Sequence, residues 1–440
     1  MMSTLTIAAA GDSFITRRLP EGDDAHQAIS SLIGPADVRF TNLEVVIRRQ
    51  EGFPSAQSGG TWASAPPEAL GDLKKYGFNA VAWATNHTLD YSYGGLEATL
   101  RALEQYGFVH AGAGRDLAEA SQVRYVETRS GRAAFIAVTS TFHESWAAGE
   151  QRRDVGGRPG VHPLRYQTTY RISAERMKQL KAIAAATGIN DYQELMAKEG
   201  FSPDYGDSED VFTFGQHLFA VSSVEGTVTK PNGHDMRRIK GLIGEARRQA
   251  DYVLVSVHSH EMAGGDKEKP AGFLTEFARS CIDEGAHAVL GHGPHIVRGV
   301  EIYKGRPILY SLGNFIFQND TVERLPADFY EKYGLTGEHN TADALDARSG
   351  GDTRGLGANP KVWSSVIALL DMEGGVLKQL TLYPISLGYG QPRYRRGWPV
   401  LTKDTEVLTR IQRLSREFGT ELTVDPDKAE ARWTAVQADI

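Results

Sequence analysis

The sequence predicts a layered α/β fold. Short apolar runs of strand length alternate with amphipathic segments of helix length along most of the chain, which is the pattern of such folds. The 440 residues exceed the usual size of a single core, and a hydrophobic fraction of 41% is enough for a large one. One large α/β domain with insertions, or two domains, would both agree with these numbers.

The expected elements follow in order. Strands are predicted at 4–10 and 38–44, a helix at 66–78 with proline near its start and glycine near its end, a strand at 79–87 and a helix at 94–108. Further strands are predicted at 108–114, 132–140, 217–223, 252–260 and 287–293. Two paired β regions follow, at 297–317 with a turn at Lys304 and Gly305, and at 362–385 with a turn at 373–375. A charged helix at 404–419 comes last.

Two segments depart from this alternation. Residues of about 144–216 are polar, arginine-rich and partly helical, and residues of about 319–360 form a second long excursion. Segments of this length act as lids or binding surfaces, or they are disordered decoration. We therefore expect one domain over 1–400 with insertions at about 144–216 and 319–360, followed by a C-terminal helical tail at 401–440.

Composition narrows the function classes. With 48 basic and 55 acidic residues, the net charge of -7 argues against nucleic-acid binding. Cys281 is the single cysteine and recurs at helical spacing with apolar neighbours, so neither a disulfide framework nor a thiolate metal cluster is expected. The N-terminal apolar run lacks a preceding positive region, and no run reaches the roughly 18 apolar residues of a membrane span. We expect a cytoplasmic protein that does not bind membranes.

Polar and ionisable residues follow five of the predicted strands. Ligands of layered α/β proteins bind beyond the carboxyl ends of the strands, so these five tips should converge on one pocket. A single such residue is more often a turn or cap residue, but all five tips together favour a site. Histidine, carboxylate and amide side chains are ligand types that suit Zn, Mn or Fe. The residues are Asp12, Asn42, Glu44, Asn86, His87, His258, His260, His292 and His295.

The same residues lie in motifs that resemble the CapA family of capsule and poly-γ-glutamate synthesis proteins. The motifs are GDSFITRR, FTNLEVVI, ATNHTLDYSYGGLEATLRALEQYGFVHAGAG and GAHAVLGHGPHIVRGVEIYKGRPILYSLGNFIF. The resemblance implies a two-sheet α-β-β-α sandwich of the metallo-dependent phosphatase (calcineurin-like) type with inserted loops. By position it implies metal ligands or a catalytic histidine at Asp12, Glu44, Asn86, His87, His258, His292 and His295. Ser311 and Asn314 belong to the signature without an obvious ligand role.

The chain departs from the pattern of that superfamily at several positions. The usual Asp-x-His is Asp12-Ser13-Phe14 here, and Glu44 stands where an aspartate commonly bridges two metals. The family's HHPH is HGPH, because Gly293 replaces a histidine, and its HWGxE is HSHE. A two-metal site needs ligands on both ions. We therefore expect no required cofactor, with Asp12, Glu44, Asn86, His258 and His292 as vestigial ligands for a residual Mn, Zn or Ca ion.

Some CapA-like proteins are peptide epimerases of lasso-peptide biosynthesis, and the resemblance implies this activity here. The expected substrate is a ribosomal precursor peptide whose C-terminal tryptophan is converted from the L to the D form, with a leader-binding protein as a possible partner. Asp12 and His295 are the expected proton-transfer pair. The expected substrate- and enolate-binding residues are Glu44, Asn86, His87, His258, His260 and His292. Arg152, Arg153, Arg158 and Arg165 are further expected to receive a terminal carboxylate.

Two other functions stay open at this point. One is a metal-dependent phosphoesterase or related hydrolase, which the fold type favours, although a fold does not determine function. The other is a role in capsule or poly-γ-glutamate synthesis, as the family name suggests.

Overall fold

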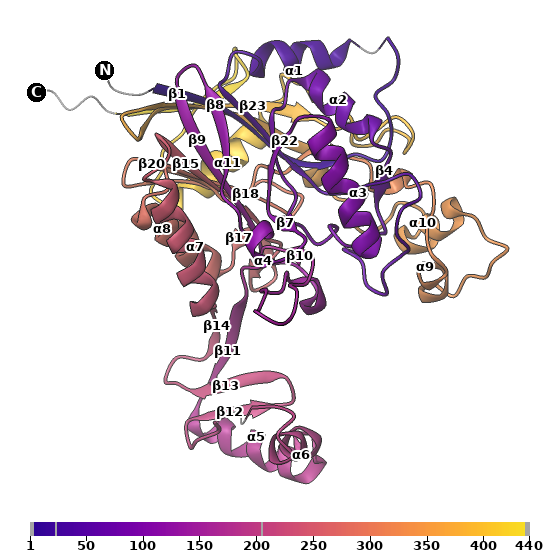
Figure 1. Cartoon of the computed structure of the whole chain (residues 1–440), viewed down its shortest axis with the longest axis vertical. Coiled ribbons are helices and arrows are strands. Elements are labelled where there is room, and N and C mark those ends of the chain that lie inside the picture. The colour runs from indigo at the N-terminus through magenta and orange to yellow at the C-terminus, as the bar shows by residue number, and fades with distance from the viewer. Residues whose placement is uncertain (1–3, 23, 204–205, 436–440) are drawn as a thin grey trace, which may run out of the picture.

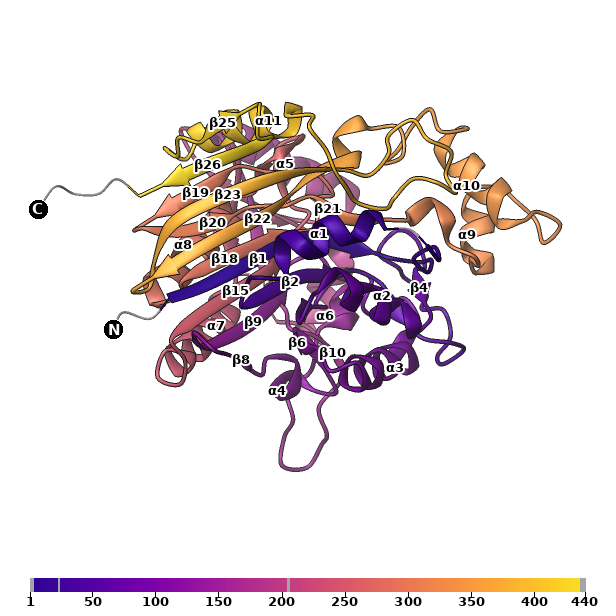
Figure 2. The same ribbon diagram turned by 90° about the horizontal axis from the view of Figure 1, so that it is seen from above.

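Two β-sheets pack face to face in the computed structural model, which describes residues 4–22, 24–203 and 206–435 (Figure 2). The larger sheet has the strand order β25 (Thr423–Asp425), β26 (Glu430–Thr434), β23 (Val376–Ser386), β22 (Ser364–Glu373), β1 (Thr4–Phe14), β2 (Val38–Leu43), β5 (Ala80–Ala82) and β6 (Val109–Ala111). Two further strands pair with it, β21 (Asn314–Phe317) with β1 and β24 (Val400–Leu401) with β23. The smaller sheet has the order β19 (Val300–Tyr303), β20 (Arg306–Leu309), β18 (Ala288–His292), β15 (Tyr252–His258), β9 (Gly131–Thr139) and β8 (Arg124–Thr128).

Helices cover the outer faces of both sheets. Helices α1 (Ala25–Ile33), α2 (Glu68–Tyr76) and α3 (Ser92–Gln105) cover the larger sheet, and α7 (Gly233–Ala246) and α8 (Gly272–Glu284) cover the smaller one (Figures 1 and 2). Because helices cover one face of β1 and the smaller sheet covers the other, the strand is apolar on both faces. Ile7 and Ala9 join the core between the sheets, and Ala8 and Ala10 join the core beneath the helices. The predicted two-sheet sandwich with flanking helices is confirmed.

The C-terminal segment is part of the sandwich. Its predicted helix is present as α11 (Glu406–Arg416), and Val407, Leu408 and Ile411 on this helix join the core between the two sheets. Strands β25 and β26 then extend the edge of the larger sheet, with β26 paired to β23. The expectation of a helical tail over 401–440 therefore differs from the structure up to residue 435, because the segment completes the inter-sheet core. Residues 436–440 lie outside the described residues.

The first excursion contains a separate arm, which we define as residues 166–231. Strands β11 (Tyr166–Ile172), β12 (Val211–Phe214), β13 (His217–Val221) and β14 (Gly226–Pro231) form its four-stranded sheet, covered by α5 (Ala174–Thr187) and α6 (Asp191–Lys198). The arm projects from the sandwich in Figure 1. The strand predicted at 217–223 thus belongs to the arm and not to the sandwich, and the insertion extends to Pro231 instead of 216.

The residues before the arm return to the sandwich. They include η1 (Glu144–Trp146) and β10 (Gly160–Val161), which pairs with β7 (Ala113–Gly114) next to α4 (Leu117–Ala120). Beyond β15, a small ladder joins β16 (Met262–Ala263) and β17 (Asp266–Pro270).

The second excursion, at 319–360, is also folded against the sandwich. It contains η2 (Asn319–Thr321), α9 (Ala327–Lys332) and α10 (Thr341–Ser349), and η3 (Pro360–Trp363) follows. Phe329 and Ala344 from this excursion pack with Trp62 and Tyr91 in a small separate apolar cluster. Next to them, β3 (Val46–Ile47) pairs with β4 (Ser64–Ala65). Within the described part of the chain, every helix is too short or too polar to cross a bilayer.

Candidate functional site

The strand tips converge as the sequence predicts. Asp12 lies opposite Asn42 where β1 pairs with β2, and His258 lies opposite His292 where β15 pairs with β18. Strand β1 is parallel to β2, and β15 is parallel to β18. The carboxyl ends of these strands meet at one edge of the sandwich. Each predicted centre residue is less than a tenth exposed, apart from His260, whose side chain is 30% exposed. The residues brought together are Asp12, Glu44, Asn86, His87, His258, His260, His292 and His295.

The Asp12 carboxylate is held from two sides. The Asn42 side-chain amide donates to Oδ1 at 2.8 Å, and the backbone N–H of Gly293 donates to Oδ2 at 2.9 Å. The Nδ1 atom of His292 lies 3.4 Å from Oδ1. One donor is a backbone group and the other is a short side chain on the neighbouring strand, so the carboxylate has a fixed orientation.

A chain of contacting imidazoles crosses the centre. His258 Nδ1 lies 3.0 Å from His292 Nδ1, and His258 Nε2 lies 3.0 Å from His260 Nε2. The amide oxygen of Asn86 lies 2.8 Å from His258 Nε2. Burial, followed by the charges of the neighbouring histidines, lowers the pKa of His258 well below its usual value. His258 is therefore neutral near pH 7 and offers one nitrogen lone pair.

The Glu44 carboxylate is fully buried. Neither of its oxygens has a hydrogen-bond partner among the residues that the structure describes. The nearest basic atoms are His258 Nε2 at 3.5 Å and His295 Nδ1 at 3.7 Å. Burial first, and then the charge of Asp12, raise the pKa of Glu44 well above its usual value. An isolated buried carboxylate is costly, so Glu44 is protonated or bound to a cation.

His295 presents one defined nitrogen to the site. The side-chain amide of Asn314 donates to the backbone oxygens of His295 and Val362, so its own oxygen accepts from His295 Nδ1 at 2.9 Å. This bond places the ring proton on Nδ1 and leaves the lone pair on Nε2. Burial lowers the pKa of His295 to about 4, against the opposing effect of Asp12. His295 is therefore a neutral imidazole with its basic nitrogen at Nε2.

Asp90 is a site residue that the sequence analysis missed. His87 Nδ1 lies 2.7 Å from Asp90 Oδ2, and the backbone N–H groups of Gly59 and Ala63 donate to the two carboxylate oxygens. Burial raises the pKa of Asp90, and His87 counteracts part of that rise. The signal was the three-residue spacing in Asn86-His87-Thr88-Leu89-Asp90, which lets a turn bring the carboxylate back to the imidazole.

Two departures from the superfamily pattern have structural counterparts. Phe14 follows Asp12 by two positions on β1, and its ring packs edge-on against His87 with centroids 5.0 Å apart. Gly293 has φ of +119°, and a Cβ there would lie 2.8 Å from the backbone nitrogen of Ser259. Position 14, where the superfamily pattern has a histidine, therefore carries a phenyl ring. Position 293, the second such position, has no room for a side chain.

The fold type implies metal ions, and the donor set of this chain suits a divalent cation. Asp12, His258 and His292 each offer an atom within 4.8 Å of the other two, and so do Glu44, His260 and His295. The two Glu44 oxygens without hydrogen-bond partners are available as acceptors for a cation. Mixed carboxylate and imidazole ligands are typical of zinc and manganese sites.

A cavity of about 490 Å³ borders the centre next to His260. The backbone N–H of His260 donates to Thr141 Oγ1 at 2.9 Å, and both Thr141 and Glu261 line the cavity. Arg158 and Arg165 line it too, but Arg165 forms a two-pronged ion pair with Asp235 at 2.7 and 2.8 Å. Two of its nitrogens thus bind Asp235, while the side chain stays 50% exposed, and its predicted role in receiving a substrate carboxylate stays a prediction.

The other predicted arginines are less constrained by ion pairs. Arg158 donates from Nε and Nη2 to the backbone oxygen of Ala147. Arg152 is exposed and lies 3.4 Å from Asp154, and Arg153 is exposed as well.

This fold and this edge of histidines and carboxylates define a metallophosphatase-like α/β sandwich protein. The sequence matches the family of the bacterial capsule synthesis protein PGA_cap over residues 6–319. The chain belongs to this family, which includes the CapA proteins.

Comparison with individual proteins agrees with the family. The chain is 34% identical to the uncharacterized protein y4sH of Sinorhizobium fredii over 434 residues, which cover 96% of this chain and 91% of that protein. It is 22% identical to the capsule biosynthesis protein CapA of Bacillus anthracis over 321 residues, covering 71% of this chain and 60% of that protein. Among solved structures, a hypothetical protein from Thermus thermophilus gives a TM-score of 0.41 at 13% identity, covering 86% of this chain and 98% of that chain.

Proposed function

We propose that the protein is a peptide epimerase that inverts a Cα centre, with the C-terminal tryptophan of a ribosomal lasso-precursor peptide as the substrate residue. The observation that carries the proposal is the pairing of Asp12 and His295 at one buried centre, with His295 Nδ1 lying 3.9 Å from Asp12 Oδ2. Each group has fixed partners behind it, Gly293 for Asp12 and Asn314 for His295. Inversion needs two proton-transfer groups within reach of one carbon.

The proposed reaction uses the basic nitrogen that the structure leaves on His295. The separation of 3.9 Å between Nδ1 and the carboxylate is too short to hold a carbon, so the carbon is reached through Nε2. The group that removes the Cα proton starts without a proton, and the group that returns one starts protonated, so that when His295 Nε2 is the base Asp12 enters as the carboxylic acid. The base takes the Cα proton, the electron pair of the C–H bond moves into the enolate, and the acid gives its proton to the opposite face of the carbon, which inverts the centre. The two groups end with their protonation states exchanged, and proton exchange with water restores them.

Neighbouring side chains support the charge of the enolate. Burial raises the pKa of Glu44, which favours its protonated form, and in that form Glu44 donates a hydrogen bond. Asn86 and the imidazoles of His87 and His292 are further donors at the same centre. Donors that are already oriented before the reaction stabilise a developing oxyanion strongly.

The proposed reaction has no required metal step. Support comes from Phe14, which fills a usual ligand position with an apolar ring, and from Gly293, where a side chain does not fit. The groups that would hold a residual cation are Asp12, His258 and His292 together with Glu44 and His260. A bound divalent ion would supply Lewis-acid stabilisation of an oxyanion.

Deuterium uptake tests the proposal directly. Purified protein is incubated with candidate peptides in deuterium oxide, with and without chelator, and the product is analysed for one deuteron at a Cα. Asp12→Asn and His295→Ala should each lower the exchange rate by roughly a hundredfold or more, while peptide binding is kept. His234→Ala is the matched control, because that side chain is 63% exposed. Near-normal exchange in either active-centre variant would refute the acid/base pair, and loss of exchange with chelator would refute the metal-free reaction.

A metal-dependent phosphoesterase is the second candidate, favoured by the two groups of three ligand atoms. In that case hydrolysis of a generic phosphodiester should increase with added Mn²⁺ and fall in Glu44→Gln. Absence of both effects, with deuterium uptake present, would exclude this candidate.

A further inference from the structure

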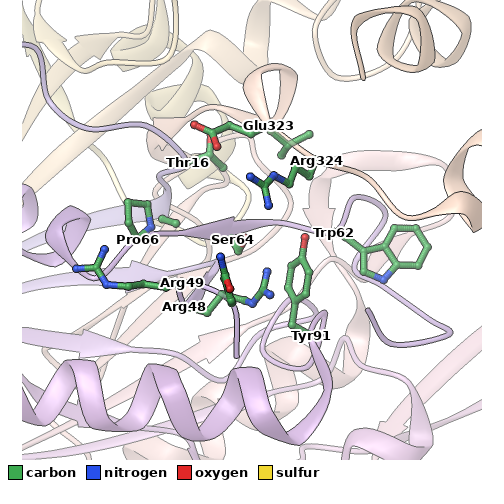
Figure 3. Close-up of a pocket in the computed structure, with 12 residues that line it drawn as sticks. Thr16, Arg48, Arg49, Trp62, Ser64, Pro66, Tyr91, Glu323 and Arg324 are labelled. Carbon is green, nitrogen blue, oxygen red and sulfur yellow. The ribbon is translucent and has the colours of Figure 1, made fainter. Parts of the chain in front are cut away.

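A second cavity, of about 380 Å³, lies between the sandwich and the excursion at 319–360. Figure 3 shows it with Arg48, Tyr91 and Ser64 on one side and Arg324 on the other. Arg48 and Ser64 come from the β3–β4 region, whereas Arg324 comes from the excursion. We call this cavity the Arg48/Arg324 pocket. Its residues play no part in the proposed proton transfer.

Two guanidinium groups in this pocket, those of Arg48 and Arg324, have no ion-pair partner in the part of the chain that the structure describes. The Arg48 guanidinium stacks 4.0 Å from the centre of the Tyr91 ring, and its Nε donates to the backbone oxygen of Glu51. Among the described residues, no carboxylate lies within 4.0 Å of the Arg48 or Arg324 guanidinium. Arg49, by contrast, is paired with Glu68, so its charge is compensated.

Neutral donors lie beside these charges. The hydroxyl groups of Tyr91 and Ser64 line the same cavity, and Tyr91 points toward Arg324 in Figure 3. Tyr91 is only 6% exposed and packs with Trp62 and Phe329, so its hydroxyl has a fixed position. Guanidinium groups together with hydroxyl donors in one cavity are the groups that bind an oxyanion. Glu323 also lines the cavity and limits the surplus positive charge.

The pocket adjoins the active centre through the chain itself. Tyr91 directly follows Asp90, and Asp90 binds His87 at 2.7 Å. The residue that holds His87 and a residue that lines the pocket are therefore neighbours in the chain.

We propose that the Arg48/Arg324 pocket is a carboxylate-binding subsite that holds an acidic side chain of the peptide substrate. The peptide part of this statement rests on the proposed function, whereas the oxyanion site depends only on the pocket. An oxyanion could also come from free phosphate, so the test compares these two sources.

Calorimetric titration of the full chain tests the subsite without relying on turnover. The probes are a capped glutamate tripeptide, the matching glutamine tripeptide and inorganic phosphate. We expect the glutamate peptide to bind and the glutamine peptide not to bind. Arg324→Gln and Arg48→Gln should each weaken binding by roughly tenfold or more, and Tyr91→Phe, which keeps the ring, by a smaller factor.

Arg416→Gln is the matched control, because this exposed arginine lies on α11 and pairs with Glu421 outside the pocket. It should bind the glutamate peptide as the wild type does. Equal binding of the two peptides, or unchanged affinity in Arg324→Gln, would overturn the subsite. Binding of phosphate alone would overturn the assignment to a peptide carboxylate. Since binding is measured, these outcomes are independent of whether the protein epimerises a peptide.

Discussion

Replacing Gly293 with alanine should damage both the stability and the active centre. The position has φ of +119°, which an L-residue rarely adopts, and the added Cβ would meet Ser259 N at 2.8 Å and His260 Cδ2 at 3.1 Å. Backbone strain of this kind costs about 1–3 kcal/mol. Alanine keeps the backbone N–H that donates to Asp12, but a backbone shift that relieves the clash would move this donor away, and loss of a hydrogen bond to a charged group costs about 1.5–3 kcal/mol. Partial relaxation leaves an expected loss of about 2–4 kcal/mol in the free energy of unfolding.

The assay is urea unfolding at pH 7, followed by far-UV circular dichroism. Gly265→Ala is the matched control, because nothing lies within 4 Å of a Cβ there and its φ is not in the left-handed region. The control should change the free energy of unfolding by less than about 0.5 kcal/mol. If Gly293→Ala unfolds at the same urea concentration as Gly265→Ala, the steric and hydrogen-bond reasoning is refuted.

Three further predictions concern other residues. Burial, and then the charge of Arg238, lower the pKa of His162 to about 3 in the folded protein, whereas the pKa in the unfolded chain is near 6.5. Above pH 6.5 the imidazole is neutral in both states and the fold keeps its full stability. As the pH falls from 6.5 toward 3, the unfolded chain binds a proton that the folded protein does not, and stability is lost. The free energy of unfolding should therefore fall by about 2 kcal/mol from this group between pH 7 and 5, and His162→Gln should show a smaller fall; an equal fall would contradict the assignment. Asp90→Asn should lower deuterium exchange by roughly tenfold or more at unchanged peptide affinity, because His87 loses its carboxylate partner; an unchanged rate would remove His87 from the reaction. Phe14→His should tighten Mn²⁺ binding at least about tenfold in calorimetric titration, since histidine is a metal ligand and phenylalanine is not, and unchanged affinity would place residue 14 outside the ligand set.

The location of the centre could be predicted because parallel strands end at one edge. Asp12, His258 and His292 follow long apolar runs, and that pattern alone places their side chains beyond the strand ends. The isolation of Glu44 could not be predicted, because it depends on which atoms of His258 and His295 turn toward the carboxylate. The same limit applies to Asp90, whose partner is determined by a turn.

The placement of short strands was the other limit. Residues 218–221 form a short continuous apolar run like that of a core strand, but in the arm both faces of β13 are only partly buried. Strands β25 and β26 have 3 and 5 residues, and their pairing depends on the neighbouring β23 more than on their own sequence.

The attachment of the arm affects how this protein can be altered. The chain enters the arm after Arg165 and leaves it before Asn232, and the backbone N–H of Asn232 donates to the oxygen of Arg165 at 2.7 Å. The two ends of the arm are thus adjacent. Sites where a segment leaves and re-enters a domain at neighbouring positions tolerate insertion and removal of that segment. A short turn joining 165 to 232, or a foreign segment with neighbouring ends, could replace the arm as one cassette. Binding of a chosen ligand could be grafted there while the edge of the sandwich that carries Asp12 and the histidines stays intact.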